Sequence, residues 1–311
     1  MFGGLEIEFF ELLKYPEYYP FIFAFLAGYA IMSLFEGKTM LRQLENEIQK
    51  NIQKIPRKPL SLLLSGGIDS SLVLALLKKE YPKIPIHTFS LARSKDYPDV
   101  VFAREIAEMF ETDHHEMILS KPELEKYNKE YDNIRKHNLK GDINVYILCS
   151  IARQYSNVIV TGDGGDELFG GYWLHQYPLG HKETGSIHNI ENIHPASQKH
   201  MKEMVRLGFR NFLYTDKSTT QDYEAVWEYF VKVISPNHLE PLLHTTNILK
   251  IDTYTPLFSK NLLNFMKTIP INERINRKIE KDLASKYLPK SIIERESIGF
   301  DLALEKEISV N

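Results

Sequence analysis

Two glycine-rich loops, each directly after a short apolar run, limit most strongly what this chain can fold into. The apolar runs are 60–64 (LSLLL) and 157–161 (NVIVT), and the loops are 65–71 (SGGIDSS) and 161–172 (TGDGGDELFGGY). Short apolar runs bounded by turn residues are typical of buried strands. An apolar segment at 72–77 predicts a helix directly after the first loop. Both loops are therefore expected where a buried strand ends.

Strand and helix patterns alternate through the first half of the 311-residue chain. Apolar spacing predicts helices at 39–55, 99–110, 121–137 and 142–155, and further strands at 84–90 and 114–119. In the helix at 99–110, Phe102, Ile106 and Met109 are expected to share one face. The alternation predicts an α/β fold, a doubly wound parallel sheet with helices on both faces.

The pattern changes after Tyr172. Helices without clear strands are predicted at 196–214, 221–234, 259–268 and 276–287. We expect them to form a C-terminal helical subdomain, about 173–311, at the C-terminal edge of the sheet. Sheet and subdomain together make one predicted domain, 39–311.

The first 38 residues form a separate apolar N-terminal segment. Within it, residues 18–35 carry no charge, and a run of 18 residues is at the lower limit for crossing a bilayer. The segment has neither the basic front region nor the cleavage site of a secretory signal. This favours an apolar helix that packs on its own domain or on a partner, with membrane contact as the alternative.

Composition narrows the function classes. The net charge is −3 and the pI about 6.4, so the basic face typical of a nucleic-acid-binding protein is not expected. The single cysteine, Cys149, lies in the apolar run 143–151 and is predicted to be a small core residue. One cysteine permits no disulfide framework, which favours a cytoplasmic location, with membrane association as the alternative.

The first loop has the residues of a phosphate cradle. A glycine pair allows a tight turn, and a helix start supplies free N–H groups and partial positive charge. The loop residues with these roles, including three hydroxyl donors, are Ser65, Gly66, Gly67, Ser70 and Ser71. Asp69 would repel a bare phosphate, so its presence indicates an intervening Mg²⁺. A glycine pair alone is often only a turn, but strand, Ser-Gly-Gly-x-Asp-Ser and helix in that order is more specific.

The second loop adds two carboxylates. Asp163 and Asp166 follow a buried strand and are expected at the same sheet edge as Asp69, because parallel strands end in one crevice. Three carboxylates around a polyphosphate imply a divalent metal. The alternative is an acidic, glycine-rich loop exposed to water.

Together, SGGIDSS and TGDGGDELFGGY resemble the asparagine synthetase family of PP-loop ATP pyrophosphatases. Further segments are similar to that family over about 39–303. They are the strand His87–Ser90, the unit 103–116, the stretch 251–270, the basic segment Arg277–Lys281, and the signature Arg295, Gly299 and Phe300.

The resemblance implies an adenine nucleotide alpha hydrolase-like (HUP-type) sheet, with ATP and Mg²⁺ as cofactors. It implies that Asp69 and Asp166 hold the metal and that Lys278, Asp163 and Asp69 are catalytic. The cofactor-binding residues that it implies are Leu64, Ser65, Gly66, Gly67, Asp69, Ser70, Ser71, Phe89, Ser90, Thr161, Gly162, Asp163, Gly164, Asp166 and Lys278.

The reaction implied has two steps. A small carboxylate, by default aspartate, attacks the α-phosphate of ATP and releases pyrophosphate, and ammonia or another amine then attacks the acyl-adenylate. The family's glutaminase domain has no room in the roughly 38 preceding residues, so ammonia is expected from solution or from a separate glutaminase subunit. Tyr254, Ser259 and Ser297 depart from the family pattern, which leaves the substrate open.

Several alternatives stay open. The chain could be a lactam-forming or other amide ligase of the same family, a tRNA-modifying PP-loop enzyme, or a nucleotide-binding scaffold in a complex; self-association is also plausible. The single cysteine and the acidic pI disfavour the tRNA reading. His114 and His115 are adjacent on a predicted strand and so face opposite ways, which favours a structural role over a metal site.

Overall fold

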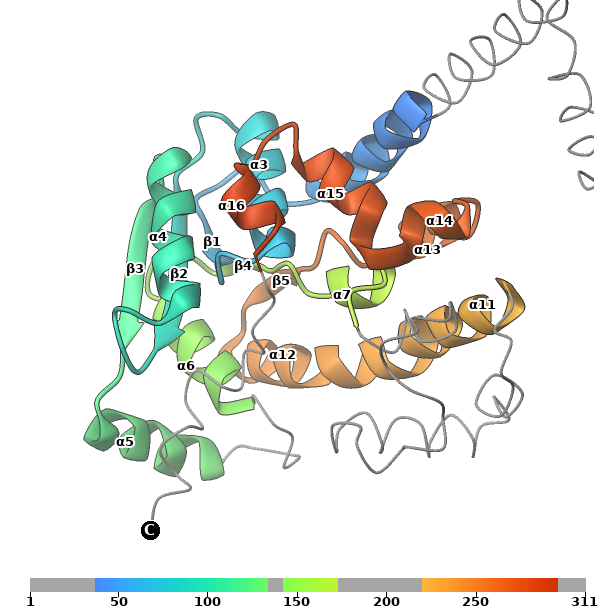
Figure 1. Cartoon of the computed structure of the whole chain (residues 1–311). Coiled ribbons are helices and arrows are strands. Elements are labelled where there is room, and N and C mark those ends of the chain that lie inside the picture. Colours follow the sequence, from blue (N-terminus) through green and yellow to red (C-terminus); the bar gives the residue numbers. More distant parts are fainter. Residues whose placement is uncertain (1–36, 134–141, 173–219, 296–311) are drawn as a thin grey trace, which may run out of the picture. The chain divides into compact units, whose positions relative to one another are not determined.

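The computed structural model describes residues 37–133, 142–172 and 220–295 (Figure 1). The chain divides into two compact units, Met1–Glu45 and Asn46–Asn311. In the first unit the described residues, 37–45, are helical. The second unit begins with helical residues 46–52 and contains every strand of the described chain.

A five-stranded parallel sheet organises the second unit. Its strands are β1 (Leu60–Leu63), β2 (Ile86–Ala92), β3 (Asp113–Ile118), β4 (Val158–Val160) and β5 (Asp252–Tyr254). The spatial order is β3-β2-β1-β4-β5, and all four neighbouring pairs are parallel. The reversal of strand order around β1 is that of a doubly wound sheet, so the predicted fold class is confirmed.

Helices connect the strands and continue after them. Between strands lie α3 (Ile68–Glu80), α4 (Pro98–Met109), α5 (Lys121–Asp132), α6 (Asp142–Ala152) and α7 (Gly165–Leu168). Between β4 and β5 also lie α11 (Thr220–Tyr229) and α12 (Ser235–Leu249), and after β5 come α13 (Lys260–Met266), α14 (Ile271–Arg274), α15 (Lys278–Ala284) and α16 (Lys290–Ile293). A π-helical turn, Phe230–Ile234, joins α11 to α12, and a 3₁₀ turn, Ile275–Arg277, precedes α15.

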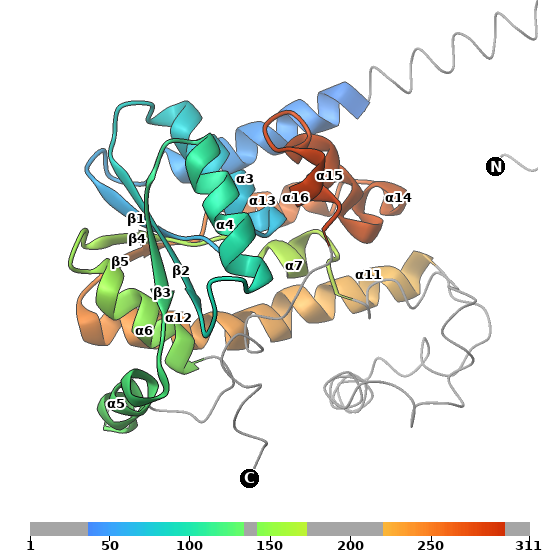
Figure 2. The ribbon, with the colours of Figure 1, turned by 60° about the vertical axis from the view of Figure 1, so that its left-hand side comes forward.

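Both faces of the sheet are covered by helices (Figure 2). On one face, Phe89 and Leu91 of β2 form a core with Ile147 and Leu148 of α6 and Leu242 of α12. Side chains on a strand alternate between faces, so Leu60 and Leu62, both fully buried, pack on the opposite side. Helix α3 contacts β1, and it is buried along most of its length because it lies over the middle of the sheet.

Two expectations about the C-terminal part were wrong. Strand β5 was not predicted, because its short sequence, DTY, has no apolar run; it forms by pairing with β4. Helix α12 was not predicted either, since Pro236 and Pro241 break the pattern; Pro236 follows directly after the π-helical turn Phe230–Ile234. The helices predicted at 221–234, 259–268 and 276–287 are confirmed in substance, and 196–214 lies outside the described residues.

The expected apolar face of α4 also needs correction. Met109 is 51% exposed, whereas Val100, Ala103 and Ile106 are buried. The helix therefore packs on the rest of the protein through the face that carries Val100, Ala103 and Ile106, and Met109 lies outside that face. Cys149 is fully buried in the core, as expected, and burial with nearby Asp163 raises the pKa of its thiol to about 12.

No helix in the three described stretches combines the length and apolar character needed to cross a membrane. The apolar segment 18–35 lies outside those stretches.

Candidate active site

A cavity of about 610 Å³ opens at the carboxyl ends of β1, β2 and β4. Its walls are the two glycine-rich loops, the end of β2, and side chains from α6, α12 and the segment before α15. Twelve of the predicted cofactor-binding residues line it: Leu64, Ser65, Gly67, Asp69, Ser70, Phe89, Ser90, Thr161, Gly162, Asp163, Gly164 and Asp166. Gly66, Ser71 and Lys278 are not among the lining residues.

The first loop turns sharply between β1 and α3. Gly66 has φ +68°, and a Cβ there would lie 2.6 Å from the Phe102 carbonyl carbon of α4, so both conformation and packing require glycine. The Ser65 and Ser70 hydroxyls lie 3.2 Å apart, and the Gly67 amide donates to Ser65 Oγ. Gly67 caps α3 without a side-chain hydrogen bond, which leaves the first amides of a 13-residue helix available to an anion.

The second loop packs directly on the first. Thr161 is fixed by its amide, which donates to the Tyr254 carbonyl of β5. A Cβ on Gly162 would lie 2.6 Å from the Ser70 backbone nitrogen, and a Cβ on Gly165 would overlap the Asp69 carboxylate. The absence of side chains at these two positions is what allows the loops to meet.

Arg277 joins the carboxylates of both loops. Its Nη1 donates to Asp69 Oδ2 at 2.9 Å and to Glu280 Oε2 at 3.0 Å, and its Nη2 pairs with Asp166 Oδ1. Burial opposes the charge on this guanidinium, but the carboxylates of Asp69 and Glu280 outweigh that effect and raise the pKa of Arg277. The two predicted metal ligands are thus brought together, with an arginine between them.

The backbone before α15 decides which basic side chain reaches the cavity. Asn276 and Arg277 both have left-handed conformations, with φ of 54° and 60°. Two successive non-glycine residues in that region are uncommon and mark a turn held by its surroundings. This turn directs Arg277 into the cavity wall with only 10% of its side chain exposed.

Lys278, predicted as a catalytic residue, has a different environment. Its side chain is 50% exposed and pairs with Glu273 and, at 3.5 Å, with Asp282. Its predicted role stays a prediction. Arg277 was missed by sequence reasoning although it is the adjacent residue, because the sequence does not reveal the left-handed turn that sets the direction of each side chain.

The carboxylates near Arg277 fit a divalent cation. Asp69 Oδ1 and Glu280 Oε1 are buried and have no hydrogen-bond partner among the described residues. An unpaired oxygen of Asp69 beside Asp166 is a hard donor set of the type that Mg²⁺ prefers.

Asp163 lines the cavity and is exposed there, although the groups around the cavity displace part of the water near its carboxylate. Burial raises its pKa, the Thr161 hydroxyl opposes that shift, and the carboxylates of Glu167 and Asp69 add to it. A carboxylate with a raised pKa accepts a proton more readily near neutral pH than an ordinary aspartate.

Among the cavity-lining residues is a hydrogen-bonded cluster that the sequence patterns did not reveal. Tyr172 donates to Glu167 Oε1 at 2.9 Å, and His238 Nδ1 lies 2.9 Å from the same oxygen. The Tyr172 ring stacks on Phe230 with centroids 4.9 Å apart, and burial with Glu167 raises the pKa of its phenol. His238 could not be identified because it lies on α12, which was not predicted.

Two of the positions that depart from the family pattern do not line the cavity. Ser259 caps α13 by accepting from the Leu262 amide, and Asn51 donates to its hydroxyl at 2.9 Å. Tyr254 ends β5 and contributes its backbone carbonyl to Thr161. Ser297 lies outside the described residues.

The fold and the cavity define an α/β protein that presents amides, hydroxyls and carboxylates at the carboxyl ends of parallel strands. A model of the asparagine synthase family matches residues 50–309, and the chain belongs to that family. The resemblance noted from the two loops is thereby confirmed.

Individual relatives match only part of their own length. A Methanocaldococcus jannaschii protein named as a glutamine-hydrolyzing asparagine synthetase is 32% identical over 120 residues, which is 38% of this chain and 23% of that protein. A second such protein of the same organism is 24% identical over 276 residues, 84% of this chain and 48% of that protein. The chain thus spans less than half the length of these curated relatives. Among solved structures, the NH3-dependent NAD synthetase of Campylobacter jejuni covers 81% of this chain and 98% of its own, with a TM-score of 0.33 and 16% identity.

Proposed function

We propose that this chain is an ATP-dependent, AMP-forming ligase that joins a small carboxylate to ammonia or another amine. The carboxylate, by default aspartate, would attack the α-phosphate of ATP, release pyrophosphate and form an acyl-adenylate; the amine would then displace AMP. The observation that carries the proposal is the convergence of Asp69, Asp166 and Arg277 beside the free amides at the start of α3. Membership of the asparagine synthase family supports it.

The pyrophosphate would lie in the first loop. The free amides of α3 and the hydroxyls of Ser65 and Ser70 supply donors to its oxygens. Asp69 and Asp166 would hold Mg²⁺, which neutralises phosphate charge when bound. Arg277 would offer its guanidinium to the departing pyrophosphate, and such a fixed cation in a water-poor site is most effective where charge develops.

The acceptor side would be formed by the second loop and α12. Asp163, with its raised pKa, would take a proton from the incoming amine. Glu167, Tyr172 and His238 give this wall acceptors and donors suited to a polar substrate such as an amino acid. Ammonia would come from solution or from a separate glutaminase subunit, and a lactam-forming or other amide-forming reaction would use the same first step.

The test is pyrophosphate and AMP formation from ATP·Mg²⁺ by the full chain, screened over small carboxylates with and without ammonium. We expect release with aspartate plus ammonium, and its loss in Asp69→Asn. Lys260→Gln serves as the matched control, because Lys260 opens α13 and does not line the cavity. Pyrophosphate release with another carboxylate, but not with aspartate, would change the proposed substrate and leave the proposed mechanism unchanged. Bound ATP without pyrophosphate release under any condition would refute the proposal.

A further inference from the structure

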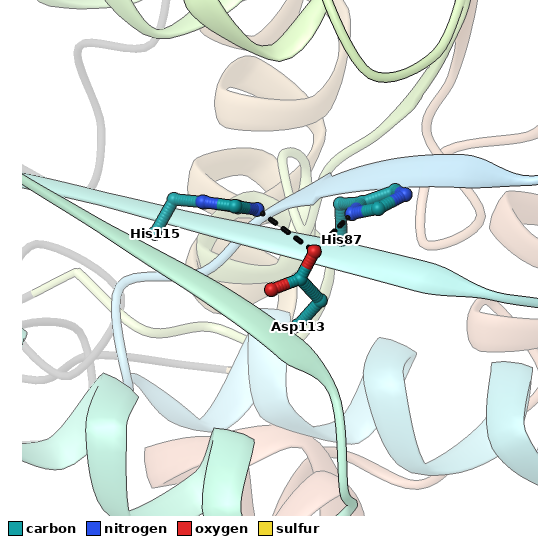
Figure 3. A group of neighbouring side chains, drawn as sticks. All are labelled: His87, Asp113 and His115. Atoms are coloured by element: carbon teal, nitrogen blue, oxygen red, sulfur yellow. Dashed lines mark hydrogen bonds and ion pairs between the residues drawn. The ribbon is translucent and has the colours of Figure 1, made fainter.

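Three potential metal ligands meet on one face of the sheet (Figure 3). His87 on β2 is in register with Asp113 on β3, and His115 follows two residues later on the same strand. Residues at i and i+2 on a strand share a face, and so do residues paired across strands. His114 points the other way, as expected, and lies within hydrogen-bond distance of Thr88 and Ser90. None of the three potential ligands lines the cavity.

The donor atoms are within reach of a single ion. Asp113 Oδ2 lies 2.8 Å from His87 Nδ1 and 3.3 Å from His115 Nε2, and one donor atom from each residue lies within 4.8 Å of the others. Ligands about 2.0–2.1 Å from a tetrahedral zinc ion are about 3.3 Å from one another. Small side-chain rotations would therefore convert the observed cluster into a coordination site.

Aromatic rings hold the histidines in place. The His115 ring stacks on Phe89 with centroids 4.8 Å apart, and its other neighbour is Tyr155 at 4.2 Å. The Tyr155 ring also lies 5.1 Å from that of His87. Coordination would therefore require little additional ordering of the two imidazoles, and ligands already held in place bind a metal more tightly.

We propose that His87, Asp113 and His115 bind one divalent transition-metal ion of the zinc type. Two imidazole nitrogens and one carboxylate oxygen suit zinc and its neighbours, whereas Mg²⁺ prefers oxygen ligands and retains water. Asp113 is 60% exposed, so water could complete the coordination. The ion would tie the edge strand β3 to β2, at the amino-terminal ends of both strands.

Metal binding predicts a specific arrangement of protons. In a metal-free cluster, His87 Nδ1 can carry a proton and donate it to Asp113, whereas His115 Nε2 lies 3.3 Å from the same oxygen, is buried and makes no hydrogen bond within the described residues. In the metal-bound cluster both nitrogens supply lone pairs, so the proton of the neutral His87 ring moves from Nδ1 to Nε2, and the neutral His115 ring carries its proton on Nδ1. The metal-free and metal-bound clusters can therefore be distinguished by which nitrogen of a histidine ring carries the proton.

The experiment measures zinc retained by the full chain after incubation with Zn²⁺ in excess Mg²⁺ and dialysis into metal-free buffer. We expect one zinc per chain in the wild type. We expect Asp113→Asn and His115→Gln to lower zinc affinity by more than about tenfold, because each removes a direct ligand. His114→Gln is the matched control, since it removes the neighbouring histidine on the opposite face and should retain the zinc.

Circular dichroism in EDTA establishes that each variant is folded. If a variant does not fold, nitrogen-detected NMR of the wild-type histidine rings decides, with zinc-dependent shifts expected at His87 Nδ1 and His115 Nε2. Equal zinc retention by wild type, Asp113→Asn and His115→Gln would overturn the proposal, because the metal would then be bound elsewhere. Folded wild-type protein that retains no zinc, or unshifted ring nitrogens, would also overturn it.

Discussion

A buried ion pair of two residues that line the cavity beside the first loop gives a stability prediction that can be worked out from the structure. Arg295 Nη2 pairs with Asp99 Oδ1, and each side chain is only 8% exposed. Arg295 also donates to the Ser65 carbonyl at 3.3 Å and lies over the Phe102 ring, 4.7 Å from its centroid. Burial raises the pKa of Asp99, while the Arg295 guanidinium opposes that shift.

Arg295→Met removes one partner and leaves Asp99 buried without a counter-charge. Breaking a buried pair from one side typically costs about 3–5 kcal/mol of unfolding free energy, whereas replacing both partners with neutral groups is often close to neutral. We therefore expect Arg295→Met to lose about 3 kcal/mol and the double variant with Asp99→Asn to recover most of it.

The pH dependence follows from the sign of the shift. Without Arg295 the pKa of folded Asp99 rises further, so the folded state binds a proton that the unfolded state releases. Stability is then present at low pH and is lost as pH rises through the folded pKa, by at most about 1.4 kcal/mol per pH unit. Arg295→Met should accordingly be closer to wild type at about pH 5 than at about pH 7.

Urea unfolding of the four proteins in the cycle, followed by circular dichroism at both pH values, measures these quantities. A coupling energy under about 0.5 kcal/mol would show that the two side chains act independently. A destabilisation of Arg295→Met that is the same at both pH values would refute the assignment of the cost to an uncompensated Asp99.

Three further predictions concern the loops and the core. Gly162→Ala should weaken ATP binding and cost about 1–3 kcal/mol of stability, because its Cβ would press on the Ser70 nitrogen; wild-type ATP affinity in calorimetry would contradict this. Cys149, with its pKa raised to about 12, should be only about 10⁻⁴ thiolate at pH 8, so a thiol reagent should react after unfolding and not before. Trp227→Phe should lower the unfolding free energy by about 1–2 kcal/mol and so shift the urea midpoint to lower concentration, since the indole N–H donates to the buried Leu168 carbonyl at 2.9 Å; an unchanged midpoint would count against that bond.

Local sequence patterns predicted the strands that are continuous apolar runs and the glycine-rich loops that follow them. Strands β1 and β4 are apolar runs, and the loops after them carry the glycines that their turns require, so both sides of the cavity could be located. Strand β5 could not be predicted, because a three-residue polar segment becomes a strand only by pairing with β4. Missing β5 did not change the predicted positions of the two glycine-rich loops.

Sequence patterns could not predict the positions of side chains that depend on tertiary structure. The choice between Arg277 and Lys278 depends on two left-handed residues; Asn276 is a residue type that favours this conformation, but nothing local indicates it for Arg277. The cluster of His87, Asp113 and His115 depends on the register of β2 against β3, which pairs residues 26 positions apart. Adjacent residues on β3 were correctly expected to face opposite ways, but the partner of His115 across the sheet could not be known.

The most direct test of the proposed active site compares Arg277→Gln with Lys278→Gln in pyrophosphate release from ATP·Mg²⁺, aspartate and ammonium. Arg277 touches both Asp69 and Asp166, so its loss should lower the rate by about 10²-fold or more, as expected when a fixed charge-stabilising group is removed. Lys278 is half exposed and paired with Glu273, so its variant should stay within about threefold of wild type. Circular dichroism establishes that both variants are folded. The reverse result, with Lys278→Gln inactive and Arg277→Gln active, would contradict the assignment of Arg277 as the cation of this site.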